Sequence, residues 1–174
     1  METKKRIPIG ISDYKMLIDE NYYYIDKTDF IRQLVEEGSL ITMLPRPRRF
    51  GKTLNLSMLR YFFERTEGNI YRHLFNGKKI EQWKDFDRYQ GKYPVITLTL
   101  KDCKAETFEG ALERIAEEVQ QEYIRHKYLP DNPDMEKSYR STFEIIRAGN
   151  PTQVQLESSL GLLTNLITTH WGIP

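Results

Sequence analysis

The sequence has very little cysteine and no long apolar run, and each absence removes a class of protein. Cys103 is the single cysteine among 174 residues, so no internal disulfide framework can form. Such a composition is typical of proteins kept in a reducing compartment. No apolar run reaches the length that crosses a bilayer, and the opening METKKRIPIG has no apolar signal core. We therefore expect a cytoplasmic protein without a membrane partner.

Net charge is also scarce, with 26 basic and 25 acidic residues giving +1 at pH 7. This balance argues against a generic nucleic-acid binder, although it leaves room for a local basic groove. Hydrophobic residues at 39% and aromatic residues at 12% indicate a globular chain rather than a disordered one. One window departs from the balance: residues 38–63 contain no Asp or Glu but hold Arg46, Arg48, Arg49, Lys52 and Arg60. This local excess predicts an anion-binding site.

That basic window has the layout of a phosphate-binding P-loop. Leu40 to Leu44 is a short apolar run with β-branched residues, which predicts a buried strand. Pro45 to Lys52 reads as a loop, and Thr53 to about Arg65 reads as an apolar helix. Strand, loop, Gly-Lys-Thr and helix in this order are the arrangement of the Walker A motif.

The chemistry of phosphate binding explains why these residue types would follow one another. The start of a helix offers unpaired N–H groups and a partial positive charge to an anion. Gly51 has no Cβ and lets the backbone approach a phosphate oxygen. Lys52 would neutralise the β- and γ-phosphates, and the Thr53 hydroxyl would be a ligand for Mg²⁺.

The motif is imperfect, and the alternative is a chance Gly-Lys-Thr at a helix start with solvated arginines. The general pattern G-x-x-x-x-G-K-[ST] places its first glycine where Arg46 stands. Two other Gly-Lys pairs, Gly77-Lys78 and Gly91-Lys92, are followed by neither Ser nor Thr and join no apolar strand to an apolar helix. The pair at Gly51 is therefore distinguished by its context.

The remaining segments predict helices separated by one further strand. Pro94 to Leu100 alternates in the manner of a strand, whereas the helix after Lys52 is apolar on nearly every side and is expected to be buried. The other helices are expected from a Ser12 cap to Asp19, a Thr28 cap to Glu37, Tyr71 to Phe75, Ile80 to Tyr89, a Thr107 cap to about Lys127, Asp134 to Ala148, and a Thr152 capping box to about Thr169.

Two of these helices carry a stripe that predicts their buried face. The stripes are Phe108, Leu112, Ile115, Val119 and Tyr123 in one helix, and Leu156, Leu160, Leu163 and Ile167 in the other. Strands that alternate with helices predict an α/β fold. With two strands, the expected fold is an incomplete, helix-rich, three-layer domain of the P-loop NTPase type.

Several of these residues together resemble the bacterial and archaeal AAA-ATPase-like proteins, many of which continue into a PD-(D/E)XK nuclease-like domain. The matching segments are Pro8 to Tyr14, Tyr23 to Ile31 with its Asp-Lys-Thr, the loop Arg46 to Leu54, and Gly91 to Ile96. The loop matches the family form R-P-R-R-F-G-K-[ST]-L residue for residue. Arg46 departs from the general Walker A pattern and agrees with this family's version of it.

The resemblance implies an ATP site with Mg²⁺. Its nucleotide-binding residues would be Arg46, Pro47, Arg48, Arg49, Phe50, Gly51, Lys52 and Thr53, with Mg²⁺ reached through Thr53. Asp26 and Lys27 are auxiliary candidates that would contact the nucleotide or the arginines of the loop. The alternative for this pair is a turn and helix cap with Lys27 in solvent.

The resemblance also implies that the chain is the N-terminal part, residues 1–174, of one longer ATPase domain. Family members carry a Walker B segment, Asp-Glu-Tyr-Asp, after a helix that resembles Leu156 to Trp171, and the sequence ends at Pro174 before such a segment. We therefore expect an ATPase in the intact protein, no catalytic residue and no hydrolysis in this chain, and self-association through unpaired strand edges. The alternative function is a non-enzymatic module whose arginine-rich loop binds nucleic acid or an acidic partner.

Overall fold

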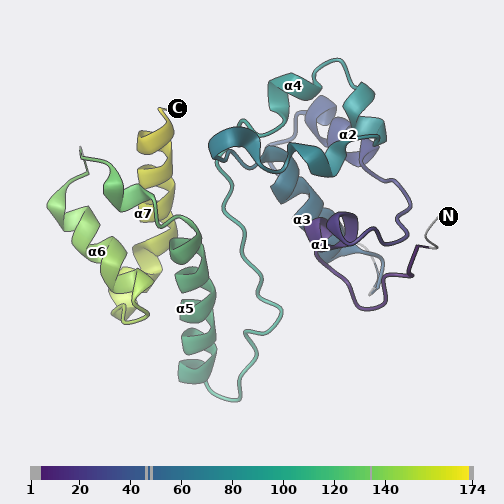
Figure 1. Cartoon of the computed structure of the whole chain (residues 1–174). Helices are drawn as coiled ribbons and strands as arrows, with labels where there is room; N and C mark the ends of the chain where they lie inside the picture. The colour runs from purple at the N-terminus through teal and green to yellow at the C-terminus, as the bar shows by residue number, and fades with distance from the viewer. Residues whose placement is uncertain (1–4, 46, 48, 134, 173–174) are drawn as a thin grey trace. The chain divides into compact units, whose positions relative to one another are not determined.

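The computed structural model describes residues 5–45, 47, 49–133 and 135–172, and these residues form two compact units. The first unit runs to Val95 and the second begins at Ile96. Each is described by itself below (Figure 1). Among the described residues, no helix is long and apolar enough to cross a membrane.

The first unit is built from short helices around one longer helix, and the second from three long helices. The elements of the first unit are α1 (Tyr14–Asp19), α2 (Asp29–Glu37), α3 (Lys52–Phe63), η1 (Glu67–Asn69), η2 (Arg72–Phe75), η3 (Lys79–Gln82) and α4 (Phe86–Tyr89), where η marks a 3-10 helix. Those of the second unit are α5 (Phe108–Arg125), η4 (Leu129–Asp131), α6 (Lys137–Arg147) and α7 (Gln153–Trp171).

The expected α/β fold is wrong. The structure is all-helical, with 56% helix and 1% strand, and its described residues form no sheet. The one extended pairing among them is an isolated parallel bridge between Glu64 and Tyr93. There, Tyr93 N–H donates to the Phe63 carbonyl at 2.9 Å and Arg65 N–H donates to the Tyr93 carbonyl at 2.7 Å. The sheet edges expected to drive self-association are therefore missing from the described part of the chain.

Neither segment expected as a strand is part of a sheet in the described portion of the chain. Leu40, Ile41 and Met43 are 103%, 87% and 81% exposed, and residues 42–45 have no regular structure. Residues 94–100 are likewise irregular, and Leu100 is 65% exposed. A strand is stable only when its N–H and C=O groups pair with another strand, so β-prone residues alone do not form one.

The first unit is organised around α3. Met58 and Phe62 are buried on one face of this helix, where they meet Tyr14 of α1 and Phe75 of η2. The rings of Phe62 and Phe75 lie edge to face, with centroids 5.2 Å apart. Leu56, by contrast, is 51% exposed, so α3 is not buried on every side as its sequence suggested.

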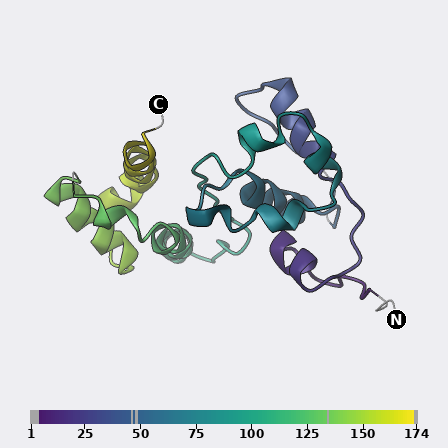
Figure 2. The same ribbon diagram turned by 45° about the horizontal axis from the view of Figure 1, so that its top comes forward.

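The second unit is a bundle in which α5, α6 and α7 pack on one another (Figure 2, where α5 and α7 are seen nearly end-on). Its core contains Tyr123 of α5, Phe143 of α6 and Leu163 of α7, all fully buried. The Tyr123 hydroxyl donates to the carbonyl of Ser159 at 2.8 Å, which satisfies a buried polar group between two helices.

The expected stripes are buried only in part. In α5, Val119 and Tyr123 are buried and Leu112 is partly buried against the core, but Phe108 is 67% and Ile115 36% exposed. In α7, Leu156, Leu163 and Ile167 are buried whereas Leu160 is 40% exposed. Ser159 and Leu166 take its place in the core, because the buried arc of a straight helix follows positions three and four residues apart.

The caps of α5 and α7 are those read from the sequence, whereas the Thr28 side chain makes no capping hydrogen bond at the start of α2. Thr107 accepts from Gly110 N–H at the start of α5, and Thr152 forms a complete capping box with Gln155 at the start of α7. Gly38, in the left-handed conformation, ends α2 as expected. The cap of α1 is Asp13 rather than Ser12, since Asp13 accepts from Met16 N–H at 2.8 Å.

We predict that Leu163→Ala destabilises the second unit by about 2–5 kcal/mol, because it leaves a cavity between α5, α6 and α7. Leu160→Ala on the same helix is the matched control and should change the free energy of unfolding by less than about 0.5 kcal/mol. Urea unfolding followed by circular dichroism measures both. Equal losses for the two variants would contradict the packing described for α7.

Candidate nucleotide-phosphate site

The predicted phosphate-binding residues lie where a loop turns into α3. Gly51 precedes the helix in the left-handed conformation, with φ 72° and ψ 24°, and Arg49 also has a positive φ of 67°. Apart from the neighbouring backbone, no heavy atom of the described residues lies within 4 Å of where a Cβ of Gly51 would be. Arg46 and Arg48 lie outside the described residues, and Pro47 and Phe50 are exposed.

The start of α3 differs from the starts of the other long helices. Its first intrahelical hydrogen bond runs from Asn55 N–H to the Gly51 carbonyl at 2.9 Å. Gly51 has no side chain that could cap the backbone N–H groups of the first turn. The first turn also holds no acidic residue. Among described helices of eight or more residues, the others begin with a threonine cap, an acidic N-cap or an acidic first turn. Of these described helices, α3 is thus the one that begins with neither a threonine nor an acidic N-cap and has no acidic residue in its first turn.

Lys52 and Thr53 open this helix with exposed side chains. The Lys52 ammonium lies 3.5 Å from the Pro47 carbonyl oxygen, a long contact that spans the loop. Thr53 follows on the next position, so its hydroxyl lies in the same first turn. The structure therefore places Pro47, Lys52 and Thr53 close to one another at the start of α3, and their role in binding a phosphate stays a prediction.

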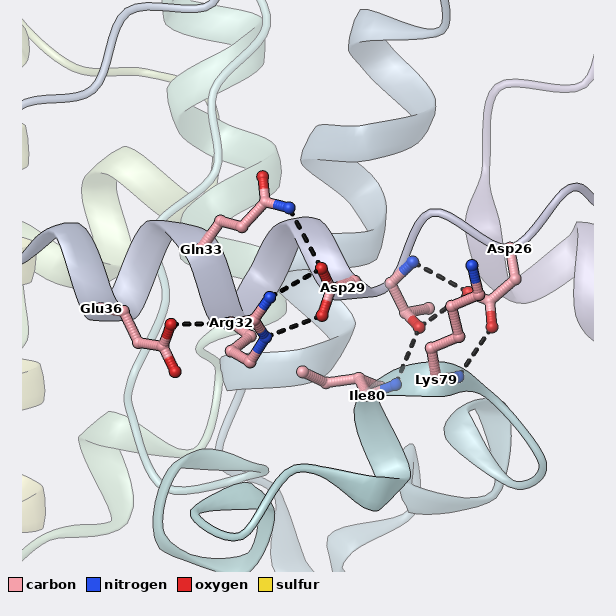
Figure 3. Close-up of polar contacts among 8 residues, drawn as sticks. Asp26, Asp29, Arg32, Gln33, Glu36, Lys79 and Ile80 are labelled. Atoms are coloured by element: carbon pink, nitrogen blue, oxygen red, sulfur yellow. Dashed lines mark hydrogen bonds and ion pairs between the residues drawn. The ribbon is translucent and has the colours of Figure 1, made fainter.

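Asp26, predicted as an auxiliary site residue, holds two parts of the first unit together (Figure 3). One carboxylate oxygen accepts from the Thr28 N–H at 2.9 Å and the Thr28 hydroxyl at 2.7 Å, and the other accepts from Lys79 N–H at 2.7 Å. The Thr28 hydroxyl in turn accepts from Ile80 N–H at 3.1 Å. These contacts fasten the start of α2 to η3.

Lys27 has an exposed side chain, and its backbone N–H donates to the Tyr24 hydroxyl at 3.2 Å. Among the described residues, no hydrogen bond or ion pair joins Asp26 or Lys27 to residues 47–53. The turn-and-cap alternative therefore describes Asp26 and Lys27 in this structure. Next to them, Arg32 binds Asp29 through two nitrogens at 2.8 and 3.0 Å and Glu36 at 2.6 Å, along the outer face of α2 (Figure 3).

Two contacts that fix α3 in place could not be predicted from the sequence. Tyr14 N–H donates to Ser57 Oγ at 2.7 Å, and the Tyr61 hydroxyl donates to Asp13 Oδ2 at 2.8 Å. Both partners in α3 are separated from α1 by more than 40 residues. Nothing in the local sequence distinguishes Ser57 and Tyr61 from other residues of the predicted helix. Their partners in α1 therefore could not be identified from the sequence.

Comparison with known proteins shows the family of the chain. Residues 8–157 match the family described as predicted AAA-ATPase. The chain belongs to this predicted AAA-ATPase family. The matched range covers α1, the loop at Gly51 and most of the second unit, so the family extends well beyond the Gly-Lys-Thr motif.

A curated relative of this ATPase-like chain is an uncharacterized protein in the vnfD 5' region of Azotobacter chroococcum mcd 1. It is 38% identical over 98 residues, which are 56% of this chain and 17% of that protein. The chain thus matches less than a fifth of the length of this relative. No solved structure matches the chain.

We predict that Asp26→Asn lowers the free energy of unfolding at pH 7 by about 1 kcal/mol. Burial alone would raise the pKa of Asp26, but the hydrogen bonds from Lys79 and Thr28 outweigh it and hold the pKa below its usual range. A lowered pKa in the folded state stabilises the protein above the unfolded pKa of about 4, and that stability is lost as the pH falls below it.

The difference between wild type and Asp26→Asn should therefore shrink between pH 5 and pH 3, as measured by urea unfolding at each pH. Asp85→Asn serves as the control, because Asp85 precedes α4 without a capping hydrogen bond. A difference that stays constant over this pH range would show that the Asp26 charge does not stabilise the α2–η3 contact.

Proposed function

We propose that this chain binds the phosphates of ATP, with Mg²⁺, at the start of α3. The chain belongs to a predicted ATPase family, and its α3 begins at Gly51-Lys52-Thr53 with no side-chain cap from Gly51 and no acidic residue in the first turn. This combination is the observation that carries the proposal. The unpaired amides of a first helical turn and the positive end of the helix dipole attract a phosphate. Lys52 adds a formal positive charge at the same point.

Each residue would have a distinct role. The Lys52 ammonium would leave the Pro47 carbonyl and form charge-assisted hydrogen bonds with β- and γ-phosphate oxygens. The Thr53 hydroxyl is a hard oxygen donor of the kind that Mg²⁺ prefers. The exposed Arg49, together with Arg46 and Arg48 of the sequence, adds positive charge to the loop. Bound Mg²⁺ would supply charge neutralisation between the phosphates.

For the intact protein we propose ATPase activity, supported by family membership alone. The second candidate is a module that binds nucleic acid or an acidic partner through the arginine-rich loop. The observation that favours it is the same basic window, together with Phe50, which is 60% exposed beside Arg49. Such binding would weaken steeply with salt and be unaffected by ATP.

We predict that Lys52→Ala weakens binding of Mg·ATP at least roughly tenfold, since a charge-assisted contact to phosphate is lost. Lys92→Ala is the matched control, because Gly91-Lys92 is another Gly-Lys pair that starts no long helix, and it should bind as wild type does. Isothermal titration calorimetry measures the three dissociation constants. Equal affinity for wild type and Lys52→Ala would contradict the proposed site.

The role of Thr53 is separable from that of Lys52. Thr53→Ala should weaken ATP binding in the presence of Mg²⁺ and leave binding in EDTA unchanged, whereas Thr53→Ser should retain the Mg²⁺ effect through its hydroxyl. The measurement is the ratio of ATP dissociation constants with and without Mg²⁺. A ratio that is the same in wild type and Thr53→Ala would remove Thr53 from the metal site.

A further inference from the structure

One carboxylate in the first unit connects the start of α1 to the body of α3. Asp13 Oδ1 accepts from Met16 N–H at 2.8 Å and thereby caps α1, while Oδ2 accepts from the Tyr61 hydroxyl at 2.8 Å. Tyr61 is 7% exposed, and this bond is partly buried. Burial, and after it the hydrogen bond to Asp13, raises the pKa of the Tyr61 hydroxyl. The Tyr61 hydroxyl therefore stays a donor to Asp13.

A second contact joins the same two helices one turn closer to the candidate phosphate site. Ser57 Oγ accepts from Tyr14 N–H at 2.7 Å and donates to the Leu54 carbonyl, in the first turn of α3, at 3.2 Å. Tyr14 cannot shift easily, because its buried ring stacks on Phe75 at 5.4 Å and its hydroxyl donates to the Leu74 carbonyl at 3.2 Å. Its amide thus presents a fixed donor to Ser57.

The α3 residues of these two contacts lie on the same face of the helix as Thr53 of the candidate phosphate site. Thr53, Ser57 and Tyr61 are spaced four residues apart, so they lie above one another on nearly one face of the helix. Because the helix is a stiff element, holding Ser57 and Tyr61 fixes the direction in which the first-turn amides point. The contacts from α1 therefore act on the orientation of the helix start without touching an anion bound there.

We propose that Asp13 and Tyr14 of the N-terminal segment, through Tyr61 and Ser57, position the start of α3 for phosphate binding. This inference rests on the proposed function of the Gly51-Lys52-Thr53 site. Asp13, Tyr14, Ser57 and Tyr61 are positioning residues, since their hydrogen bonds within the described part of the chain do not go to the loop. Loosening their contacts weakens nucleotide binding although Lys52 and Thr53 are untouched.

The test removes one hydroxyl from each connection. Tyr61→Phe keeps the buried ring and deletes the bond to Asp13, and Ser57→Ala deletes the acceptor of Tyr14 N–H. Each variant should bind Mg·ATP roughly three- to tenfold more weakly than wild type by calorimetry, a typical range for residues that act through a packed network. Circular dichroism at the same temperature confirms that each variant is folded.

Tyr123→Phe is the matched control. It removes a buried tyrosine hydroxyl bond of the same 2.8 Å length, to Ser159 in the second unit, and should leave the Mg·ATP dissociation constant unchanged. Tyr61→Phe and Ser57→Ala proteins that are folded and bind as wild type does overturn the inference, as does an equal loss in Tyr123→Phe. If wild type shows no binding that depends on Lys52, the proposed function itself fails and the inference fails with it.

Discussion

Burial of one face of α3 holds the first unit together and leaves the start of the same helix at the surface. Met58 and Phe62 lie within the aromatic core, and Asp13 and Tyr14 add hydrogen bonds from α1. The end of the helix is fixed as well, since Gly91 N–H donates to the Phe62 carbonyl at 2.8 Å. A helix held along its length and at its end presents its first turn in a defined direction, which is what recognition of an anion by backbone amides requires.

The chemistry of that first turn follows from what stands immediately before it. A threonine or an aspartate before a helix uses its own oxygen to satisfy an amide, as Thr107, Thr152 and Asp13 do here. Gly51 has no such oxygen and adopts a left-handed conformation that L-residues rarely take. Under the proposed function, glycine in place of a self-capping residue and lysine after it leave the first turn of α3 available to a phosphate.

The sequence was sufficient for the longer helices and insufficient for the strands and for Ile80 to Tyr89, which was expected as one helix and forms η3 and α4. The difference between helices and strands is physical. A helix satisfies its backbone within itself, so the Thr152 capping box and the left-handed Gly38 set its ends from local residues alone. A strand depends on a partner that local composition does not reveal, which is why residues 40–44 and 94–100 were predicted wrongly. Contacts between distant residues are equally hard to predict from local sequence. The motif indicates Gly51-Lys52-Thr53 as a candidate site, but no local pattern predicts the hydrogen bond between Asp26 and Lys79, 53 residues apart.

The most direct test of the central claim is amide hydrogen exchange, resolved along the chain, with and without Mg·ATP. A phosphate held by the first turn of α3 should slow exchange in residues 49–54 and have little effect on α5, α6 and α7, and the slowing should be lost in Lys52→Ala. Unchanged exchange in residues 49–54 at saturating nucleotide, or protection centred on another segment, would contradict the assignment of the phosphate site to the start of α3.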